Sequence, residues 1–596
     1  MRSRHGPELA RAERERQETN TAEATPTVVS SPSNRKRALD SDKSQSTLEA
    51  VLAKKQAWAP DHPPAVLATK YLAEMIAIDL QSYSIVENEG FVRYSRNLEP
   101  RYVLPSRRLL SERIIPDMYI KVKESVKKSV LAANKLSFTT DTWTEGNTTK
   151  AFIGVSVHWI DSQWDRKFAV LNCEEFSARH SGDMIAEKFE TVLAAWNIPK
   201  ESCHLVLRDN AANMVRAFQH ADIPSLGCSL HTLQLAIHDC IFDQRAVSDA
   251  LAVCRRLVGH FKHSALASHR LKEIQQELQC DVLRPVQDVS TRWNSTYYMV
   301  ERLLKIKRSV SVFCAETEGM QDKSLTPNMW SLLENVKILL ELVEKLTRDL
   351  SSYDACLSAV IPAVLGLKLT LESDNRDVGV KTMKAGLIAA IDERFDPVIK
   401  QETATTATAL DPRFKLVFFK SDTVRTTVRS TVLNKALMLP QQSLACQSES
   451  AVAAPPPSCA DLTSMSSTAS NQTHEYSSGS GDVWTALAHL AGGAVPSKSG
   501  DLAVTVSAEV ATYFSQSLLP INQNPLTWWQ VNKHCLPTLA QLARVYLSPP
   551  PSSVQSERIF SLAGEVYDDH RSRLMAENAE RLVFLKFNLP LLNYKY

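Results

Sequence analysis

The sequence predicts an α/β fold joined to a larger helical part. Between about residues 136 and 207 the apolar residues alternate with a period of two, which is typical of strands, whereas elsewhere they recur at the helical period. With 596 residues the chain is too long for a single hydrophobic core, so several structural units are expected. Hydrophobic residues at 44% and charged residues at 22% are typical of an ordinary soluble protein.

Composition and pattern divide the chain into six segments. Residues 1–46 are rich in Arg, Glu, Thr, Ser and Pro, so we expect a disordered tail. Its basic triplet Arg35–Arg37 is a weak match to a nuclear import signal, and a solvated cluster explains it more simply. The other segments are a helical basic module (47–135), the first part of an α/β core (136–290), a helical insertion (291–440), a flexible low-complexity linker (441–505) and a C-terminal region that returns to the core (506–596).

The helical module begins with a run of apolar residues at helical spacing. Leu67, Tyr71, Met75 and Ile78 are predicted to form one buried stripe on a helix over residues 66–80. A second apolar run follows Pro105, and basic residues are interleaved with it. We therefore expect an apolar inner face and a cationic outer face.

The charge of this module is unevenly distributed. Residues 93–135 contain eleven Lys or Arg against four acids, although the whole chain has a net charge of only +2. Such a local excess is typical of a surface that binds phosphates, because each neutralised phosphate releases counterions. A solvated basic face is the alternative. The candidate DNA-binding residues of the module are Arg107, Arg108, Lys127 and Lys128.

Three strand candidates follow the module. Residues 136–143, 151–160 and 167–176 are rich in β-branched and aromatic side chains, and short polar turns separate them as in an antiparallel meander. A helix over residues 182–196 and a fourth strand over residues 204–207 come next. This order is that of a ribonuclease-H-like mixed sheet. The predicted fold class is therefore α/β plus α, with the sheet interrupted by the large helical insertion.

The cysteines indicate a reducing compartment. All eleven lie singly between Cys173 and Cys535, and none forms a Cys-x-x-Cys pair. The first 172 residues hold no cysteine, so no zinc-finger ligands are found there. No apolar run is long enough to cross a bilayer, and the first thirty residues are polar. A soluble intracellular protein without a membrane partner is expected.

Two aspartates lie where a sheet presents ligands. Asp141 interrupts the first strand, and Asp209 follows the apolar residues 205–207. Ligands gather at strand ends of α/β sheets, and paired carboxylates there can hold Mg²⁺. Two such ions would support phosphoryl transfer. Taken alone, each aspartate is more simply a strand-end or turn residue.

Six short motifs resemble, in their order, those of the hAT transposase superfamily. DTWTEG from Asp141 resembles the first acidic strand motif, and LVLRDNAANM with Asp209 resembles the second. GCSLHTLQLAIHD resembles the Cys-x-x-His segment, on Cys228 and His231. LDPRFK from Leu410 resembles a further recurring element.

The remaining two motifs extend the resemblance to the C-terminus. STRWNSTYYMVERL resembles the Arg-Trp-Asn-Ser element, on Arg292 and Trp293, and PSSVQSERIFSLAGEVYDDHRSRL from Pro551 resembles the C-terminal signature. The order holds from about residue 47 to residue 596. Six such motifs in one order are hard to obtain by chance.

The resemblance implies a catalytic triad of Asp141, Asp209 and Glu557, which would hold Mg²⁺ or Mn²⁺ if the protein is active. For this the chain must return and place a helix beside the sheet. The alternative for Glu557 is a carboxylate that bonds to backbone N–H groups at a helix start. Trp143 and Trp293 resemble family aromatics near the active site, where an indole could stack on an extruded base. Buried core aromatics explain both equally well.

Cys228 and His231 have three interpretations. The resemblance implies a structural or DNA-contacting role, and a packed core pair is a simpler explanation. A zinc site would need a second ligand pair at metal spacing, which the sequence lacks.

The C-terminal region resembles the family's dimerisation region. It contains an unusually apolar helical stretch, which core packing explains in part and an obligate partner surface would explain further. The candidate dimerisation residues are Trp528, Trp529, Leu536, Leu539, Leu542 and Tyr546.

Two functions follow from these expectations. The first is a domesticated nuclear protein that binds DNA, dimerises and regulates transcription, with no cofactor required for binding. The second is an active transposase that cuts and joins DNA with Mg²⁺ or Mn²⁺. A genomic remnant without a cellular role is a third possibility.

We favour the regulator. Relatives that resemble BED zinc finger proteins carry an N-terminal finger, and this chain has no such cysteines, so recognition of a DNA site is expected to be reduced, lost or delegated. The expected partners are double-stranded DNA and one or more further copies of the chain. No small-molecule substrate is expected.

Overall fold

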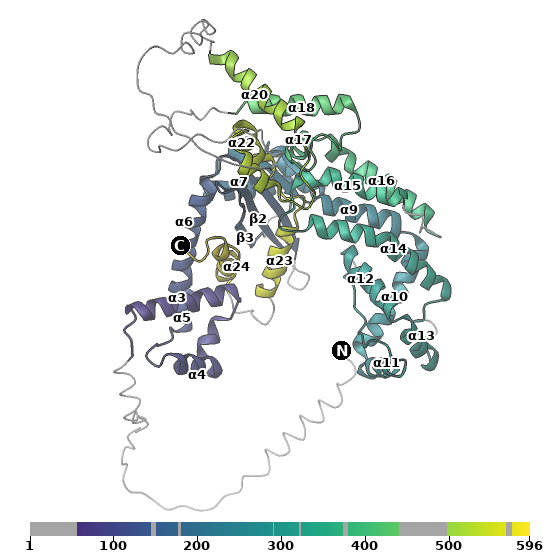
Figure 1. The fold of residues 1–596 in the computed structure, drawn as a ribbon. Coiled ribbons are helices and arrows are strands. Elements are labelled where there is room, and N and C mark those ends of the chain that lie inside the picture. The colour runs from purple at the N-terminus through teal and green to yellow at the C-terminus, as the bar shows by residue number, and fades with distance from the viewer. Residues whose placement is uncertain are drawn as a thin grey trace, which may run out of the picture.

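The structure is a computed structural model that describes residues 57–144, 151–176, 180–289, 291–320, 323–373, 379–439, 498–567 and 575–596 (Figure 1). The predicted tail (1–46), with its basic triplet, lies outside the described residues, as does most of the predicted linker (441–505).

Five strands form one mixed sheet in the order β3-β2-β1-β4-β5. β1 (Leu136–Thr144), β2 (Ala151–Ile160) and β3 (Arg166–Glu175) are antiparallel neighbours, and β4 (Cys203–Arg208) and β5 (Ser225–Gly227) continue the sheet in parallel. The predicted fold class, a ribonuclease-H-like mixed sheet with many helices, is thus confirmed. β5 was not predicted, because three residues are too few to show an alternating pattern.

Helices of the N-terminal module and of the C-terminus cover this sheet (Figure 1). Their side chains share one hydrophobic cluster with β1 to β4. The helices in this cluster are α3 (Pro63–Ile78), α6 (Ile115–Leu131), α7 (Gly182–Ala195), α8 (Ala212–His220), α23 (Val554–Tyr567) and α24 (Ala576–Leu591). The module also contains α4 (Glu89–Leu98) and α5 (Arg107–Leu109).

The prediction of the buried stripe on α3 is wrong, because the face that is buried is rotated by part of a turn from the predicted one. Leu67 and Tyr71 are 48% and 59% exposed, whereas Leu72 and Ile76 are buried. α3 packs against α24, so the direction of this distant helix decides which face is covered. Spacing alone could not distinguish two adjacent apolar stripes on one helix.

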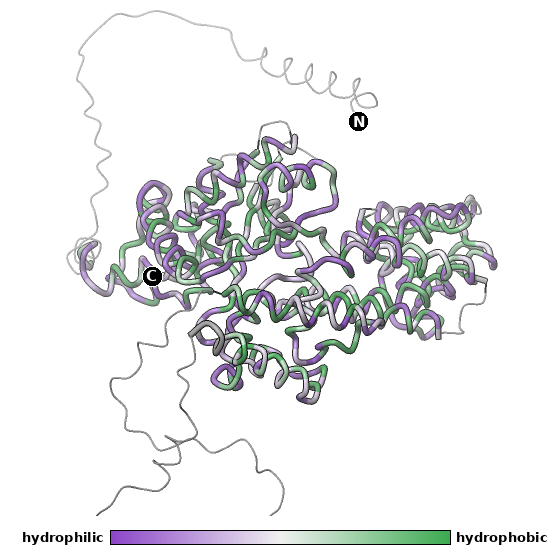
Figure 2. Tube along the Cα trace, turned by 90° about the horizontal axis from the view of Figure 1, so that it is seen from above, coloured by the Kyte–Doolittle hydropathy of each residue, from purple (hydrophilic) through white to green (hydrophobic). Residues whose placement is uncertain are grey.

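The helical part begins directly after β5, at Ser229, within the range predicted for the first part of the core. Figures 1 and 2 show it extending to one side of the sheet. None of the helices in the described residues is both long and apolar enough to cross a membrane. The helices up to the predicted linker are α9 (Ser229–Ile237), α10 (Arg245–His263), α11 (Ala265–Glu277), α12 (Trp293–Lys305), α13 (Lys307–Glu316), α14 (Pro327–Leu350), α15 (Val360–Ser373), α16 (Lys381–Lys400), α17 (Glu402–Leu410) and α18 (Asp422–Leu437). After the predicted linker come α20 (Lys498–Ser515), α21 (Pro525–Asn532) and α22 (Pro537–Tyr546).

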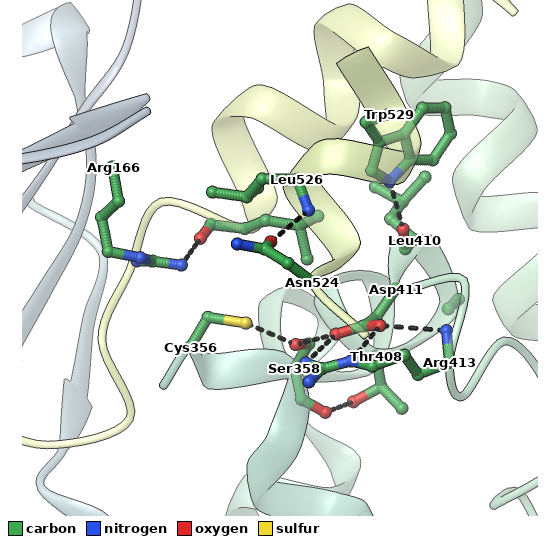
Figure 3. A network of polar contacts seen from close by, with 12 residues as sticks. Arg166, Cys356, Ser358, Thr408, Leu410, Asp411, Arg413, Asn524, Leu526 and Trp529 are labelled. Atoms are coloured by element: carbon green, nitrogen blue, oxygen red, sulfur yellow. Dashed lines mark hydrogen bonds and ion pairs between the residues drawn. The ribbon is translucent and has the colours of Figure 1, made fainter. Parts of the chain in front are cut away.

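The LDPRFK motif ties this helical part to the C-terminal region (Figure 3). The buried carboxylate of Asp411 accepts hydrogen bonds from the Arg413 guanidinium at 2.8 and 3.0 Å and from the Ser358 hydroxyl at 2.7 Å. Lys415 donates to the carbonyls of Tyr513 and Gln516, at the end of α20. A buried charge is stable only when it is paired and hydrogen-bonded, so these contacts fix the position of α20 against α17.

Candidate acidic face and nucleic-acid interface

The C-terminal signature returns to the sheet as helix α23, which packs against β1 and β2. Glu557 lies in its first turn. Ser137, Thr139 and Asp141 alternate along β1 and therefore point to one face of the sheet. The hydroxyl of Ser137 is hydrogen-bonded to that of Ser548 at 2.8 Å, and Thr139 to Ser556 at 2.9 Å.

The Thr139–Ser556 pair sets the register of α23 on β1, and the Ser137–Ser548 pair fixes the segment before this helix. Ser137, Thr139 and Ser556 are fully buried, so their hydroxyls would lack water if the pairs were broken. Glu557 follows Ser556 in the sequence, and Asp141 lies two residues beyond Thr139 on the same face. The pairs therefore hold Glu557 close to Asp141.

A glycine makes room for α23. Gly154 is the partner of Asp141 in the β1–β2 pair, and a Cβ atom there would lie 2.9 Å from the ring of Phe560. Real Cβ atoms do not approach a ring carbon so closely, so the absence of a side chain lets Phe560 pack on the sheet. The helix can therefore lie low enough for Glu557 to face the sheet residues.

Asp141 and Glu557 line one cavity of about 260 Å³, which we call the acidic cavity. Burial and the negative charges of Asp209 and Glu557 raise the pKa of Asp141 to about 8. Partial enclosure of its carboxyl raises the pKa of Glu557, while the positive charges of Arg292 and His231 oppose this. The other residues of the acidic cavity are Thr142, Trp143, Arg292, Phe560, Ser561 and Gly564.

Asp209 lies just beyond β4 and does not line the acidic cavity. Its carboxylate accepts a hydrogen bond from the backbone N–H of Ala211 at 3.2 Å. The next residue, Asn210, occupies the space in front of Gly227, where a Cβ atom would lie 2.0 Å from the Asn210 amide oxygen. Asp209 is close enough to influence the pKa of Asp141, so the fold brings all three predicted acids to one region.

The three acids do not fit a metal ion in this arrangement. Across the part of the chain that the structure describes, no group of three His, Cys, Asp or Glu side chains could hold one. Each aspartate instead uses a carboxylate oxygen to accept a nearby backbone N–H. Asp141, Asp209 and Glu557 thus share a region of the fold without forming a metal-binding cluster.

A second hollow, of about 540 Å³, adjoins the acidic cavity and shares Arg292 and Glu557 with it. We call it the basic groove, because His231 and Arg292 line it. Trp293 also lines it but is only 2% exposed, which leaves no free face to stack on a base. The remaining lining residues come mainly from the first turns of α9, α12 and α23.

Cys228 joins two of these helices. Its buried sulfur accepts the backbone N–H of His231 at 3.5 Å and that of Ser553 at 3.4 Å. The first contact caps α9 and the second lies just before α23. Cys228 therefore supports the wall of the basic groove, and His231 is placed at its surface.

Trp143 is half-buried beside Asp141. Its ring stacks on Phe152, with centroids 5.6 Å apart, and on Phe560, with centroids 6.2 Å apart. A Cβ atom added at Gly564 would lie 3.6 Å from the edge of the Trp143 ring. Trp143 thus belongs to the contact between β1, β2 and α23, and only part of it reaches the acidic cavity.

The candidate basic residues of the N-terminal module lie on the surface, but several are paired. Arg107 lies 3.9 Å from Glu87, and Arg108 lies 2.9 Å from Glu112. Lys128 is exposed. Among the described residues, no carboxylate lies within ion-pair distance of the exposed cations Arg96 and Lys121 on α4 and α6, or of Lys127 and Lys128.

Most of the predicted dimerisation residues lie inside the folded chain. Trp529, Leu536, Leu539 and Leu542 are at most 3% exposed, and Tyr546 is 7% exposed. Trp529 stacks on Trp164 and Tyr513, and Trp528 packs against the same cluster. The aromatic and apolar stretch meets other helices of its own chain, so five of these six side chains are buried there and Trp528 is partly exposed.

The site residues Ser556, Ser548 and Gly154 were not predicted. One signal was present, because Ser137 and Thr139 are small polar residues at alternate positions before Asp141 in a strand expected to be buried. Their partners lie more than 400 residues away, at separations of 411 and 417 residues. Only the folded chain shows the pairing.

Three regions of the chain match known families. Residues 139–222 match the ZBED1 RNase-like domain, and residues 226–339 match the ZBED1 RNase-like helical domain. Residues 509–589 match the hAT family C-terminal dimerisation region. These matches cover the sheet, the first helices of the helical part, and the segment that contains α23.

Curated relatives are similar over most of the chain. Human zinc finger BED domain-containing protein 4 is 28% identical over 90% of this chain and 44% of its own length. Human zinc finger BED domain-containing protein 6 is 28% identical over 90% of this chain and 56% of its own length. The putative AC transposase of Zea mays is 25% identical over 87% of this chain and 65% of its own length. The chain thus spans about half the length of the BED-domain relatives.

Proposed function

Because this chain is homologous over most of its length to hAT transposases and to zinc finger BED proteins, we propose that it is a hAT-derived protein that binds double-stranded DNA as a dimer in the nucleus and regulates transcription. The match to the hAT dimerisation region supports the dimer. The nuclear location and the regulatory role are inferred from the relatives.

A single observation carries the DNA-binding part of this proposal. Arg96, Lys121 and Lys128 of the N-terminal module are exposed, and the described residues offer them no carboxylate partner. Lys121 and Lys128 are two helical turns apart on α6, so they lie on the same side of the helix. Exposed ammonium and guanidinium groups of this kind bind backbone phosphates.

The neighbouring ion pairs strengthen the argument. Arg107 and Arg108 are paired with Glu87 and Glu112 on the surface, where such pairs are worth at most ~1 kcal/mol. A phosphate can replace a carboxylate in such a pair at little cost. The module therefore offers these two guanidinium groups in addition to its unpaired cations.

The test measures binding of the full chain to a duplex DNA of random sequence at several salt concentrations. The variant Arg96→Gln/Lys121→Gln/Lys128→Gln is expected to bind more weakly, and the slope of log K against log salt should fall by about 0.9 for each lost phosphate contact. Sedimentation of the same samples measures the oligomeric state. A wild-type chain that is monomeric at micromolar concentration and binds no DNA would contradict the proposal.

A second candidate function is cutting and joining of DNA. It is favoured by the proximity of Asp141, Asp209 and Glu557, which is reflected in the raised pKa of Asp141. The arrangement does not itself hold a metal, so we give this function second place. A strand-transfer assay on the terminal repeats of the parent element, with Asp141→Asn for comparison, tests it. Equal signals from the two proteins would reject catalysis.

A further inference from the structure

We propose that the helical hairpin formed by α10 and α11 carries a second phosphate-binding surface, so that the chain holds one DNA duplex at two separated places. This inference rests on the proposed function, because the first place is the N-terminal module. It adds a site on the helical part, which the sequence motifs do not mark.

A stretch that spans the end of α10 and the beginning of α11 is strongly basic and contains no acid. Residues 255–272, RRLVGHFKHSALASHRLK, contain five Lys or Arg and three His but no Asp or Glu. The N-terminal module has more cations, but its acids are interleaved with them. The acids of the two helices, Asp249, Glu273 and Glu277, lie outside this stretch. A locally positive stretch of this kind favours binding of a polyanion, because it attracts the phosphates.

The structure divides these cations into two groups. Arg255 forms an ion pair with the buried Asp288 at 2.8 Å, and Arg270 pairs with Glu277 and Glu316 at 2.8 Å. These two arginines connect α10 and α11 to the adjacent segments. They have structural partners and are not part of the proposed surface.

The other three cations face the solvent. Arg256, Lys262 and Lys272 are exposed, and no ion pair engages them within the described residues. Lys262 lies in the last turn of α10, and Lys272 lies on α11. A free cation on a surface gains from a phosphate without first losing another partner, so these three are the residues that we assign to the surface.

The turn between the helices adds further donors. His263 ends α10, Ser264 forms the turn, and His269 follows on α11, where it lies 3.3 Å from Glu273. The Ser264 hydroxyl caps α11 by accepting the N–H of Ala267 at 3.1 Å, and Ser268 donates to the Phe261 carbonyl at 2.7 Å. These hydrogen bonds make the turn rigid, so that little conformational entropy is lost when it contacts a ligand.

The position of the hairpin favours a long, continuous partner. In Figure 1, α10 and α11 lie at one end of the molecule and α4 and α5 at the other, with α23 between them, and Figure 2 shows the same separation from above. A duplex carries phosphates along its whole length, so it can reach both ends at once. A short anionic peptide could not. Duplex DNA is therefore the partner that this arrangement fits.

The test compares three triple variants of the full chain. For each variant, binding is measured at several salt concentrations, first to a short DNA duplex and then to a DNA duplex that is several-fold longer. The hairpin variant is Arg256→Gln/Lys262→Gln/Lys272→Gln. The charge-matched control is Lys381→Gln/Lys420→Gln/Arg429→Gln, whose residues are exposed elsewhere on the helical part. The module variant described above is the third protein. All six side chains of the first two variants lie on the surface, so the fold is expected to persist, and circular dichroism checks this.

On the long duplex, the hairpin variant is expected to lower the salt slope by up to about 3, whereas the control leaves it unchanged. On a duplex too short to reach both surfaces, the loss should be smaller. A hairpin variant that matches the control on both duplexes, while the module variant binds weakly, would overturn this inference and leave the proposed function intact. A wild-type chain that binds neither duplex would overturn both. An effect seen with single-stranded RNA but not with duplex DNA would overturn the assignment to DNA.

Discussion

Gly154 is the residue on which the closeness of helix and sheet depends. It lies opposite Asp141 in the β1–β2 pair, and the ring of Phe560 fills the space where a side chain would start. Phe560 is 4% exposed and packs beside Trp143, so it has no free space into which to move. A change at Gly154 must therefore be transmitted to α23.

We expect Gly154→Ala to lower the free energy of unfolding by ~1–3 kcal/mol, because overpacking a close contact forces the helix outward. Chemical denaturation measures this. Gly366→Ala is the control, because Gly366 lies within α15 and has no atom within 4 Å of an added Cβ. There the stability should stay the same or rise by up to ~1 kcal/mol. Equal losses in both variants would show that the contact with Phe560 does not matter.

Glu580 on α24 is a second residue with an unusual environment. Burial and the negative charge of Glu174 raise its pKa to about 7, although Lys123 and Lys188 act in the opposite direction. A carboxyl with a raised folded-state pKa binds a proton more readily in the folded chain than in the unfolded chain. Its contribution to stability is therefore present below its ordinary pKa of 4.5 and is lost as the pH rises through about 7.

Glu580→Gln keeps the shape of the side chain and removes this titration. We expect the variant to be more stable than the wild type above pH 7 and to show a flatter decline of stability between about pH 4.5 and 7. Thermal unfolding across this range measures it. Replacing the exposed Glu187 by Gln provides the control, which should leave the pH profile unchanged. Asp141, with a pKa of about 8, also makes stability fall as the pH rises, and this contribution is present in both variants.

At the scale of secondary-structure elements, α23 is held on β1 by matched polar groups as well as by apolar packing. The pairs Ser137–Ser548 and Thr139–Ser556 are buried hydroxyl contacts between segments far apart in the sequence. Arg166 of β3 supports the approach to α23 by donating to the carbonyls of Leu547 and Ser548. Apolar contacts alone would allow the helix to slide, whereas hydrogen bonds to fixed partners define one position.

Ser556→Ala tests this role of the hydroxyl. The substitution should cost about 1 kcal/mol and should increase hydrogen exchange of the α23 amides, because Thr139 loses one partner. Ser561→Ala serves as the control on the same helix, since its exposed hydroxyl only bonds back to the Glu557 carbonyl. Exchange that rises equally in both variants would mean that the buried pair does not anchor the helix.

At the scale of the whole molecule, the C-terminal region serves the core of its own chain. The match to a dimerisation region covers residues 509–589, but the apolar residues that the sequence marks as an interface are buried against the helical part. A surface between two copies must therefore be formed by other side chains of this region. Both α20 and α23 pass through this region.

Leu539→Ala distinguishes a core residue from an interface residue. Leu539 is fully buried, so truncation should lower the free energy of unfolding by ~2–5 kcal/mol. Since the contacts lie within one chain, this loss should not depend on protein concentration, as it would if Leu539 stabilised a dimer. Denaturation at two widely different concentrations decides between these outcomes. Val531→Ala, at a residue that is 73% exposed, is the control and should have little effect on unfolding.

The local structure and the outline of the fold could be predicted from the amino-acid pattern. The alternation of apolar residues located β1 to β4 to within two residues at either end, because the pleat of a strand imposes a period of two on any half-buried or buried segment. Asp141, Asp209 and Glu557 were selected by their motifs, and the three family matches agree with the resemblance.

Which surfaces are covered depends on packing between distant parts of the chain and could not be predicted. Leu67 and Trp529 are both apolar residues at helical spacing, yet one is 48% exposed and the other is fully buried. The difference arises from helices that lie far away in the sequence, and such long-range packing leaves no mark on local periodicity. The same reason explains why the roles of Ser556, Gly154 and the basic hairpin could be recognised only in the folded chain. Each role depends on a partner or a position that is distant in the sequence.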